Sequence, residues 1–185
     1  VSGNVTSYNY MGQMWWKDTG GDYPQRFGPL MHGGHPMMNL LEGNYSIERF
    51  RADDAWGSSS HFTLLRNKFA RRNRGTPCAQ GWVVDLERHN TYYNFLGNIL
   101  GTGGMESEYE VYREPNHYEC DSSTGSQVIY RLGYSYGNEN PNDAKYDNEV
   151  RCTLFRCKNW VSQRSNPDTA GNTAANPYYV STTGA

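Results

Sequence analysis

The 185-residue sequence predicts an all-β fold, a parallel β-helix in which short strands wind into stacked coils. Similar phrases occur three times, as NLLEGNYS (39–46), FTLLRNKF (62–69) and YNFLGNIL (93–100). A repeat of this length is typical of a solenoid. Gly, Asn, Asp and Ser interrupt each apolar run before it can supply the faces of long helices, so strands are favoured.

An asparagine column is the second observation. Aligning the three phrases superimposes Asn44, Asn67 and Asn98, and the opening VSGNVTS adds Asn4. An Asn side chain carries both a donor and an acceptor, so asparagines stacked about 4.8 Å apart can hydrogen-bond along the stack. Asn also tolerates the left-handed backbone of a sharp corner. We therefore expect an asparagine ladder, and the alternative is that Asn serves simply as a common turn residue.

The spacing of these asparagines predicts the register of the coils. The first two are 23 residues apart and the next two are 31 apart, so we place an insertion in the polar segment 71–81. An alignment without gaps then sets residues 50–67 over residues 81–98, with Asp54 on Asp85. The same alignment places Ser60 on Thr91 and His61 on Tyr92.

The chain is expected to form one β-helix domain over residues 1–161, followed by a polar C-terminal strap or tail at 162–185. Segments 11–36 and 101–147 are irregular and rich in Gly, Pro and aromatic residues. We therefore expect them to be two long loop excursions that interrupt the coils. The remaining coil segments are 1–10, 37–60, 61–89, a third coil from 90, and a strand at 149–157.

Composition excludes some classes of partner. The net charge is −2, which gives no reason to expect binding to nucleic acid. No apolar run is long enough for a transmembrane helix, so we expect no membrane insertion. Residue 1 already lies in a ladder-like phrase, and we expect either a mature chain or a fragment of a longer one.

The four cysteines predict at least one disulfide bond in an oxidising compartment, and four reduced, buried thiols are the alternative. Cys78 and Cys120 lie in the predicted insertions, whereas Cys157 is expected at the ladder position of its coil. The fourth is Cys152, and three pairings are open. The cysteines lack the spacing of a zinc site.

Several runs resemble the right-handed parallel β-helix proteins of the pectate-lyase-like superfamily, in particular uncharacterised secreted bacterial and phage-associated members. They are HPMMNLLEGN, DDAWGSSSHFTLLRN, HNTYYNFLGNILGT and YDNEVRCTLFRCKNW. The resemblance covers residues 1–10 and 32–160, and it implies a right-handed helix located outside the cell, on the cell surface or on a virion. It leaves function open, because the superfamily holds lyases, hydrolases, tailspikes, adhesins and inert stalks.

The resemblance also suggests candidate catalytic residues. Enzymes of this superfamily place an acidic calcium cluster and a basic proton acceptor on one face of the coils. Asp54, Asp85 and Arg88 are then the catalytic candidates, and Asp54 and Asp85 are candidate calcium ligands. No third Asp aligns with them and no base is evident. The alternative is a solvated charged face in which Arg51 and Arg88 neutralise the acids.

The histidines and serines give weaker signals. His32 and His35 are three residues apart, but no carboxylate or cysteine near them completes a metal site. The serines of GSSSH (57–61) lack the G-x-S-x-G pattern of a nucleophile elbow. We expect a hydroxyl-rich corner that hydrogen-bonds to its own backbone.

Aromatic residues in the excursions are the candidate ligand-binding residues, because exposed flat rings beside polar groups commonly contact sugars. They are Trp15, Trp16, Tyr109, Tyr112 and Tyr118. The alternative is that these rings pack on the wall of the solenoid.

These features favour a non-catalytic extracellular module for adhesion, glycan contact or assembly. The first alternative is a lyase or hydrolase of acidic polysaccharides, with calcium as its cofactor. The second is a subunit of an extracellular filament or phage tailspike, whose partners are other copies of the chain. The sequence leaves open whether the protein is an enzyme.

Overall fold

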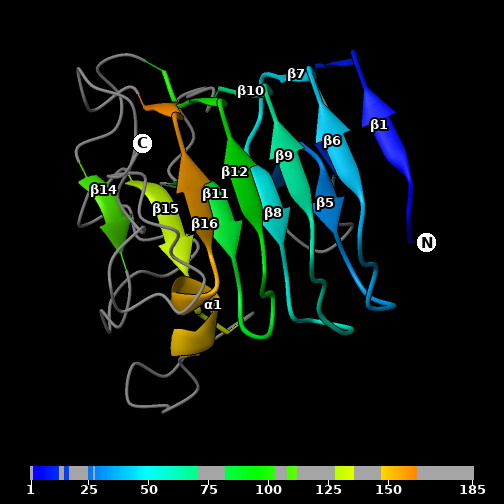
Figure 1. The fold of residues 1–185 in the computed structure, drawn as a ribbon, viewed down its shortest axis with the longest axis vertical. Helices are drawn as coiled ribbons and strands as arrows, with labels where there is room; N and C mark the ends of the chain where they lie inside the picture. The colour runs from blue at the N-terminus through cyan, green and yellow to red at the C-terminus, as the bar shows by residue number, and fades with distance from the viewer. Residues whose placement is uncertain are drawn as a thin grey trace, which may run out of the picture.

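A computed structural model describes residues 2–12, 15–16, 25–26, 28–70, 82–102, 108–111, 128–135 and 147–161. The fold is all-β, with three parallel sheets of five strands each (Figure 1). Successive strands of the chain enter the three sheets in the same order, and each circuit adds one strand to a sheet, except that β14 and β15 both join the third sheet after β13. This arrangement is solenoid-like, and the predicted all-β class with parallel strands is confirmed.

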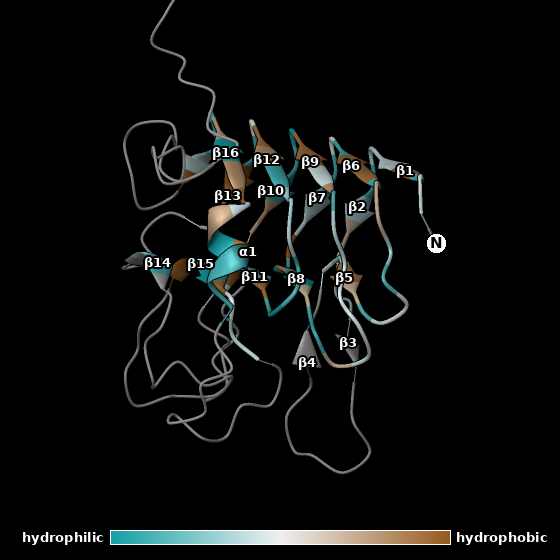
Figure 2. Ribbon diagram, turned by 60° about the horizontal axis from the view of Figure 1, so that its bottom comes forward, coloured by the Kyte–Doolittle hydropathy of each residue, from teal (hydrophilic) through white to brown (hydrophobic). Residues whose placement is uncertain are grey.

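The strands of each sheet are given in spatial order, and Figure 2 shows the first and third sheets on opposite sides of the interior. The first sheet contains β1 (Val5–Ser7), β6 (Leu40–Glu42), β9 (Thr63–Leu65), β12 (Asn94–Leu96) and β16 (Phe155–Cys157). The second contains β2 (Tyr10–Met11), β7 (Tyr45–Ser46), β10 (Lys68–Phe69), β13 (Ile99–Leu100) and β17 (Trp160–Val161). The third contains β5 (Leu30–Met31), β8 (Phe50–Ala52), β11 (Trp82–Leu86), β15 (Val128–Leu132) and β14 (Glu108–Val111). Outside the three sheets, β3 (Trp15–Trp16) pairs with β4 (Gln25–Arg26), and a short helix, α1 (Asn148–Cys152), precedes β16.

The interior is apolar because alternate residues of the short strands point inward. Leu41, Leu64 and Phe95 follow one another in register across the first sheet and are fully or almost fully buried. Phe50 of the third sheet lies 5.7 Å from Phe69 and 5.9 Å from Phe95, measured between ring centroids. Contacts between residues far apart in sequence therefore join the three sheets into one core.

Asparagine side chains hydrogen-bond from coil to coil at the corner between the first and second sheets. Each Nδ2 donates to the Oδ1 of the next asparagine at 2.9–3.1 Å, and each backbone N–H donates to the same oxygen at 2.9–3.0 Å. The members of this asparagine column are Asn9, Asn44, Asn67, Asn98 and Asn159. The residue before each one has a left-handed backbone, with φ between 53° and 63°.

Two sequence assignments around this column were wrong. Asn4 belongs to another corner, where its Nδ2 donates to Asn39 Oδ1 at 3.0 Å. Cys157 pairs with Leu96 in the first sheet, and Asn159 takes the column position instead. In both coils the residue before the true member is not the expected Gly or Arg, which concealed the match.

The predicted excursions contribute strands to the coils, which corrects their description as loops. Segment 11–36 supplies β5, and segment 101–147 supplies β14 and β15. Strand β14 precedes β15 in the chain but lies beyond it in the third sheet. Its Glu110 Oε2 lies 2.7 Å from Arg156 Nη1 in a salt bridge, and Arg156 is buried at the position that Phe95 occupies one coil earlier. This buried ion pair fastens β14 to the last described coil.

Cys152 and Cys157 are free thiols, so neither contributes to a predicted disulfide. Cys78 and Cys120 lie outside the described residues, as does the predicted strap or tail at 162–185. In the part of the chain that the structure describes, no helix has the length and apolar character needed to cross a membrane.

Removing one asparagine side chain should weaken the stack. Asn67→Ala removes the acceptor of two N–H groups of Asn44 and leaves buried groups unpaired. We expect the free energy of unfolding, measured by urea denaturation, to fall by about 1–3 kcal/mol.

Asn94→Ala is the matched control, because Asn94 is only half-buried and donates to Thr63 Oγ1 at a long 3.4 Å. Equal losses in the two variants would contradict a special role for the asparagine column.

Candidate functional site

A column of buried charges crosses the third sheet. Arg51 of β8 pairs in register with Asp85 of β11, which pairs with Arg131 of β15. These residues alternate with the inward-facing Phe50 and Tyr130, so they lie on the outer face of the sheet. All three charged residues are 3% exposed or less. Arg131 Nη1 donates to both carboxylate oxygens of Asp85, at 3.0 and 3.2 Å.

Glu87, just after β11, extends this charged network. Arg51 Nε donates to Glu87 Oε1 at 3.1 Å, and the backbone N–H of Asp54 donates to Oε2 at 3.0 Å. Burial raises the pKa of Glu87 to about 8, with a further contribution from the negative charge of Asp85, and these effects outweigh Arg51 and Arg131. Burial and the neighbouring Asp85 charge therefore favour the protonated form of Glu87.

The predicted stacking of Asp54 on Asp85 is wrong, because Arg51 takes that place. Seven residues separate Ala52 from Ser60 in one coil, whereas four separate Leu86 from Thr91 in the next. The three additional residues in the longer corner shift the register upstream of Ser60.

Downstream of that corner the alignment is confirmed. Ser60 forms a parallel bridge with Thr91, and the rings of His61 and Tyr92 are stacked with centroids 4.7 Å apart. The alignment of the asparagine phrases therefore gives the correct register for the first two sheets. It fails for the third sheet, because the corner between that sheet and Ser60 is three residues longer than the corner in the next coil.

The donor set at the candidate metal site does not fit calcium. Asp85 is held by Arg131, and Asp54 Oδ2 accepts from Arg88 Nε at 2.9 Å. Across the described ranges, no group of three or more His, Cys, Asp and Glu side chains is arranged to hold a metal ion. The side chains of Asp54 and Asp85 are also only 5% and 0% exposed. This part of the site matches the alternative in which arginines neutralise the acids, but in a buried network rather than on a solvated face.

The aromatic candidates of the excursions fall in different places. The backbones of Trp15 and Trp16 form β3, while their side chains lie outside the described residues, as do Tyr112 and Tyr118. Tyr109 is half-buried and packs on the core, with its ring centroid 5.5 Å from that of Tyr130. Tyr109 thus fits the alternative in which a ring packs on the solenoid.

The sequence interpretation missed an exposed aromatic stripe on the outer face of the second sheet. One residue from each coil contributes to it, and these residues pair in continuous register along the sheet. The members of this outer stripe are Tyr10, Tyr45, Lys68, Ile99 and Trp160. A sequence signal was present, because each member directly follows an asparagine of the column.

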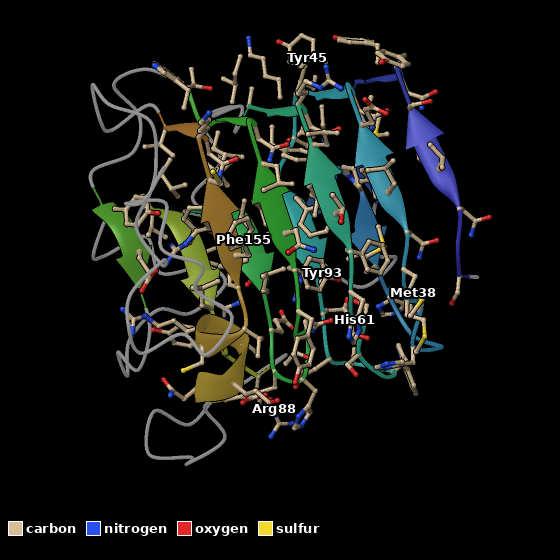
Figure 3. The ribbon with its side chains drawn as sticks, in the orientation of Figure 1. Met38, Tyr45, His61, Arg88, Tyr93 and Phe155 are labelled. Carbon is tan, nitrogen blue, oxygen red and sulfur yellow. The ribbon has the colours of Figure 1, made fainter. Side chains whose placement is uncertain are left out.

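The outer stripe is accessible. Tyr10, Tyr45, Ile99 and Trp160 are 68%, 38%, 42% and 44% exposed. The rings of Tyr10 and Tyr45 meet edge to face at 5.5 Å, and the Lys68 ammonium lies 4.7 Å from the Tyr45 ring centroid. Figure 3 places Tyr45 at the edge of the molecule opposite His61 and Arg88.

The adjoining corner adds another ring and positive charge. Tyr8 is 76% exposed, and its ring lies against Gly43, where a Cβ would come within 2.7 Å of it. Gly43 therefore permits the ring to lie on the corner. Arg66 and Lys158 occupy equivalent corner positions in later coils and are exposed. Glu42 accepts from Arg66 Nη2 at 2.8 Å and offsets its charge, which leaves Lys68 and Lys158 as the positive charges described beside the stripe.

No family model matches the chain, and no curated protein or solved structure matches it.

The charged network predicts a specific dependence of stability on pH. The pKa of Glu87 is raised from about 4.5 to about 8 in the folded state, so the folded chain binds a proton that the unfolded chain releases. Stability from this group is fully present below about pH 4.5 and is lost as pH rises through 8. We expect Glu87→Gln to flatten the fall in melting temperature between these pH values.

Glu149→Gln serves as the control, because Glu149 is exposed on α1. A Glu87→Gln variant that keeps the slope of the parent protein would contradict the assignment.

Proposed function

We propose that the chain is a right-handed parallel β-helix with an asparagine ladder, and that it acts as a surface module that contacts glycan chains. The observation that carries the proposal is the outer stripe, in which Tyr10, Tyr45, Ile99 and Trp160 are exposed in register from the first described coil to the last. Extended exposed apolar surface on a soluble domain commonly marks an interaction site.

The geometry of the stripe suits a linear polymer. Strands in neighbouring coils lie about 4.8 Å apart, so the stripe spans roughly 19 Å between its first and last members. A chain lying along the coil axis would meet a ring or an alkyl side chain at each coil. Rings offer flat apolar faces to the C–H surfaces of sugars, while Lys68 and the corner residues Arg66 and Lys158 offer hydrogen-bond donors.

The positive charge beside the stripe favours acidic glycans over neutral ones. Lys68 lies within the stripe, and Lys158 lies at the adjoining corner between the first and second sheets. An ammonium group forms charge-assisted hydrogen bonds with carboxylate or sulfate. A ligand of this kind places the protein outside the cell, on a cell surface or on a virion, which is part of the same proposal.

An enzyme acting through Asp54, Asp85 and Arg88 receives less support. These carboxylates are buried and bonded to arginines, and such pairs are commonly structural. Binding through the stripe requires no group from this network.

Assembly with other copies is a second candidate. Strands β1, β2 and β5 form the edges of the three sheets in the described part of the chain. Val5 and Tyr8 in this first coil are 64% and 76% exposed. Strand edges readily pair with further strands, so a concentration-dependent mass in light scattering would support this role.

Glycan contact is tested by affinity electrophoresis through gels containing acidic or neutral polysaccharides. The parent chain should be retarded most by acidic polymers. Tyr45→Ala with Trp160→Ala should weaken retention roughly tenfold, because two stacking platforms are lost.

Trp56→Ala is the matched control, since Trp56 is 76% exposed but belongs to the corner loop after β8, away from the stripe. No retention of the parent chain on any polymer, or an equal loss on Trp56→Ala, would reject the stripe as the contact surface.

A further inference from the structure

Two imidazoles and two hydroxyls form a continuous hydrogen-bonded chain at the corner between the third and first sheets. His35 Nδ1 lies 3.0 Å from Ser58 Oγ, and His35 Nε2 lies 3.3 Å from Ser60 Oγ. Ser60 Oγ also lies 2.9 Å from His61 Nδ1. This cluster is separate from both the outer stripe and the buried charged network, and Figure 3 shows His61 on the edge opposite Tyr45.

The fold brings the loop before β6 against the loop after β8. Gly33, Gly34 and His35 all have positive φ, so the first loop folds tightly on itself. A Cβ on Gly57 would lie 3.3 Å from the Gly34 nitrogen, which shows how closely the two backbones approach. His35 has φ of 44°, the left-handed conformation that other corner residues of the coils, such as His61 and Tyr92, also adopt.

Ser60 is held firmly in this corner. It forms parallel bridges with Met37 in the coil before and Thr91 in the coil after. Its N–H donates to the Pro36 carbonyl at 3.2 Å, and its carbonyl accepts from Met38 at 3.3 Å. His61 is fixed in turn by stacking on Tyr92. The hydroxyl of Ser60 therefore keeps its place between two imidazoles.

One proton arrangement satisfies the whole chain of bonds. His35 donates from Nδ1 to Ser58, which leaves Nε2 free to accept the Ser60 hydroxyl proton. The Ser60 oxygen then accepts from His61 Nδ1. A hydroxyl is thus paired with a base, and the far nitrogen of that base is oriented by a third group, which is the general arrangement of an activated nucleophile.

We propose that Ser60 is a nucleophile activated by His35, and that this corner cleaves small carboxylic esters such as acetyl esters of sugars. Ser60 Oγ would attack the ester carbonyl carbon while its proton passes to His35 Nε2. The alcohol leaves with that proton, and water then hydrolyses the acyl-serine to a carboxylic acid and free Ser60. Because Ser60 is only 4% exposed, the proposal is restricted to esters with small acyl groups.

The test uses a fluorophosphonate probe on the intact chain, with peptide mass spectrometry to locate the adduct, and hydrolysis of p-nitrophenyl acetate as a second readout. We expect the adduct on Ser60 and a loss of both signals in Ser60→Ala. His35→Gln should slow labelling at least tenfold and, because the His35 side chain is exposed, should leave the fold intact.

His89→Gln is the matched control, because His89 is an exposed corner histidine whose ring faces Asp147 and does not contact Ser60. Labelling that misses Ser60, or that proceeds equally in His35→Gln and the parent chain, would overturn the proposal.

Discussion

The structure depends on hydrogen bonding between asparagines in successive coils. In each coil one side-chain oxygen accepts both the backbone N–H and the Nδ2 of the asparagine before it, as Asn98 does for Asn67. The Nδ2 of Asn67 also donates to the Leu41 carbonyl one coil earlier, at 2.8 Å. A single side chain thus pairs several buried groups that would be costly to leave unpaired. Because the bonding is register-specific, it aligns the buried column of Leu41, Leu64 and Phe95, which precedes the asparagines in sequence. It also aligns the outer stripe, whose members directly follow the asparagines.

Charge is buried where the coil pattern changes. The interior column of Leu64 and Phe95 ends at Arg156, whose charge is balanced by Glu110 of β14. Burial alone would favour the neutral acid, yet Arg156 and Arg151 hold the pKa of the Glu110 carboxyl below its usual range. A buried pair contributes little net stability compared with apolar packing, but it favours one partner strongly. Here it selects β14, a strand out of sequence order, for the last described coil.

The repeated phrases were sufficient to predict the all-β class and the parallel strands. They were insufficient where the coil length varies. Asn9 and Asn159 follow Tyr8 and Lys158, which adopt the same left-handed backbone without matching the expected residue types.

The candidate sites were harder to predict for the same reason. Three additional residues in one corner moved Arg51, rather than Asp54, beside Asp85. The contact of His35 with Ser58 joins positions one coil length apart, at 23 residues, but neither belongs to the repeated phrase. Each member of the outer stripe is the residue directly after an asparagine of the column. The residue types of these members differ too much for the stripe to be recognised without knowing the register.

The direction of bonding within the asparagine column gives the most direct test. Removing the side chain in Asn98→Ala deletes the acceptor of the Asn67 backbone N–H, whereas the N–H of residue 98 still faces Asn159 Oδ1 at 2.9 Å. Hydrogen exchange followed by NMR should therefore show a selective loss of protection at Asn67, with residue 98 remaining protected. Unchanged protection at Asn67, or an equal loss at both positions, would contradict the account.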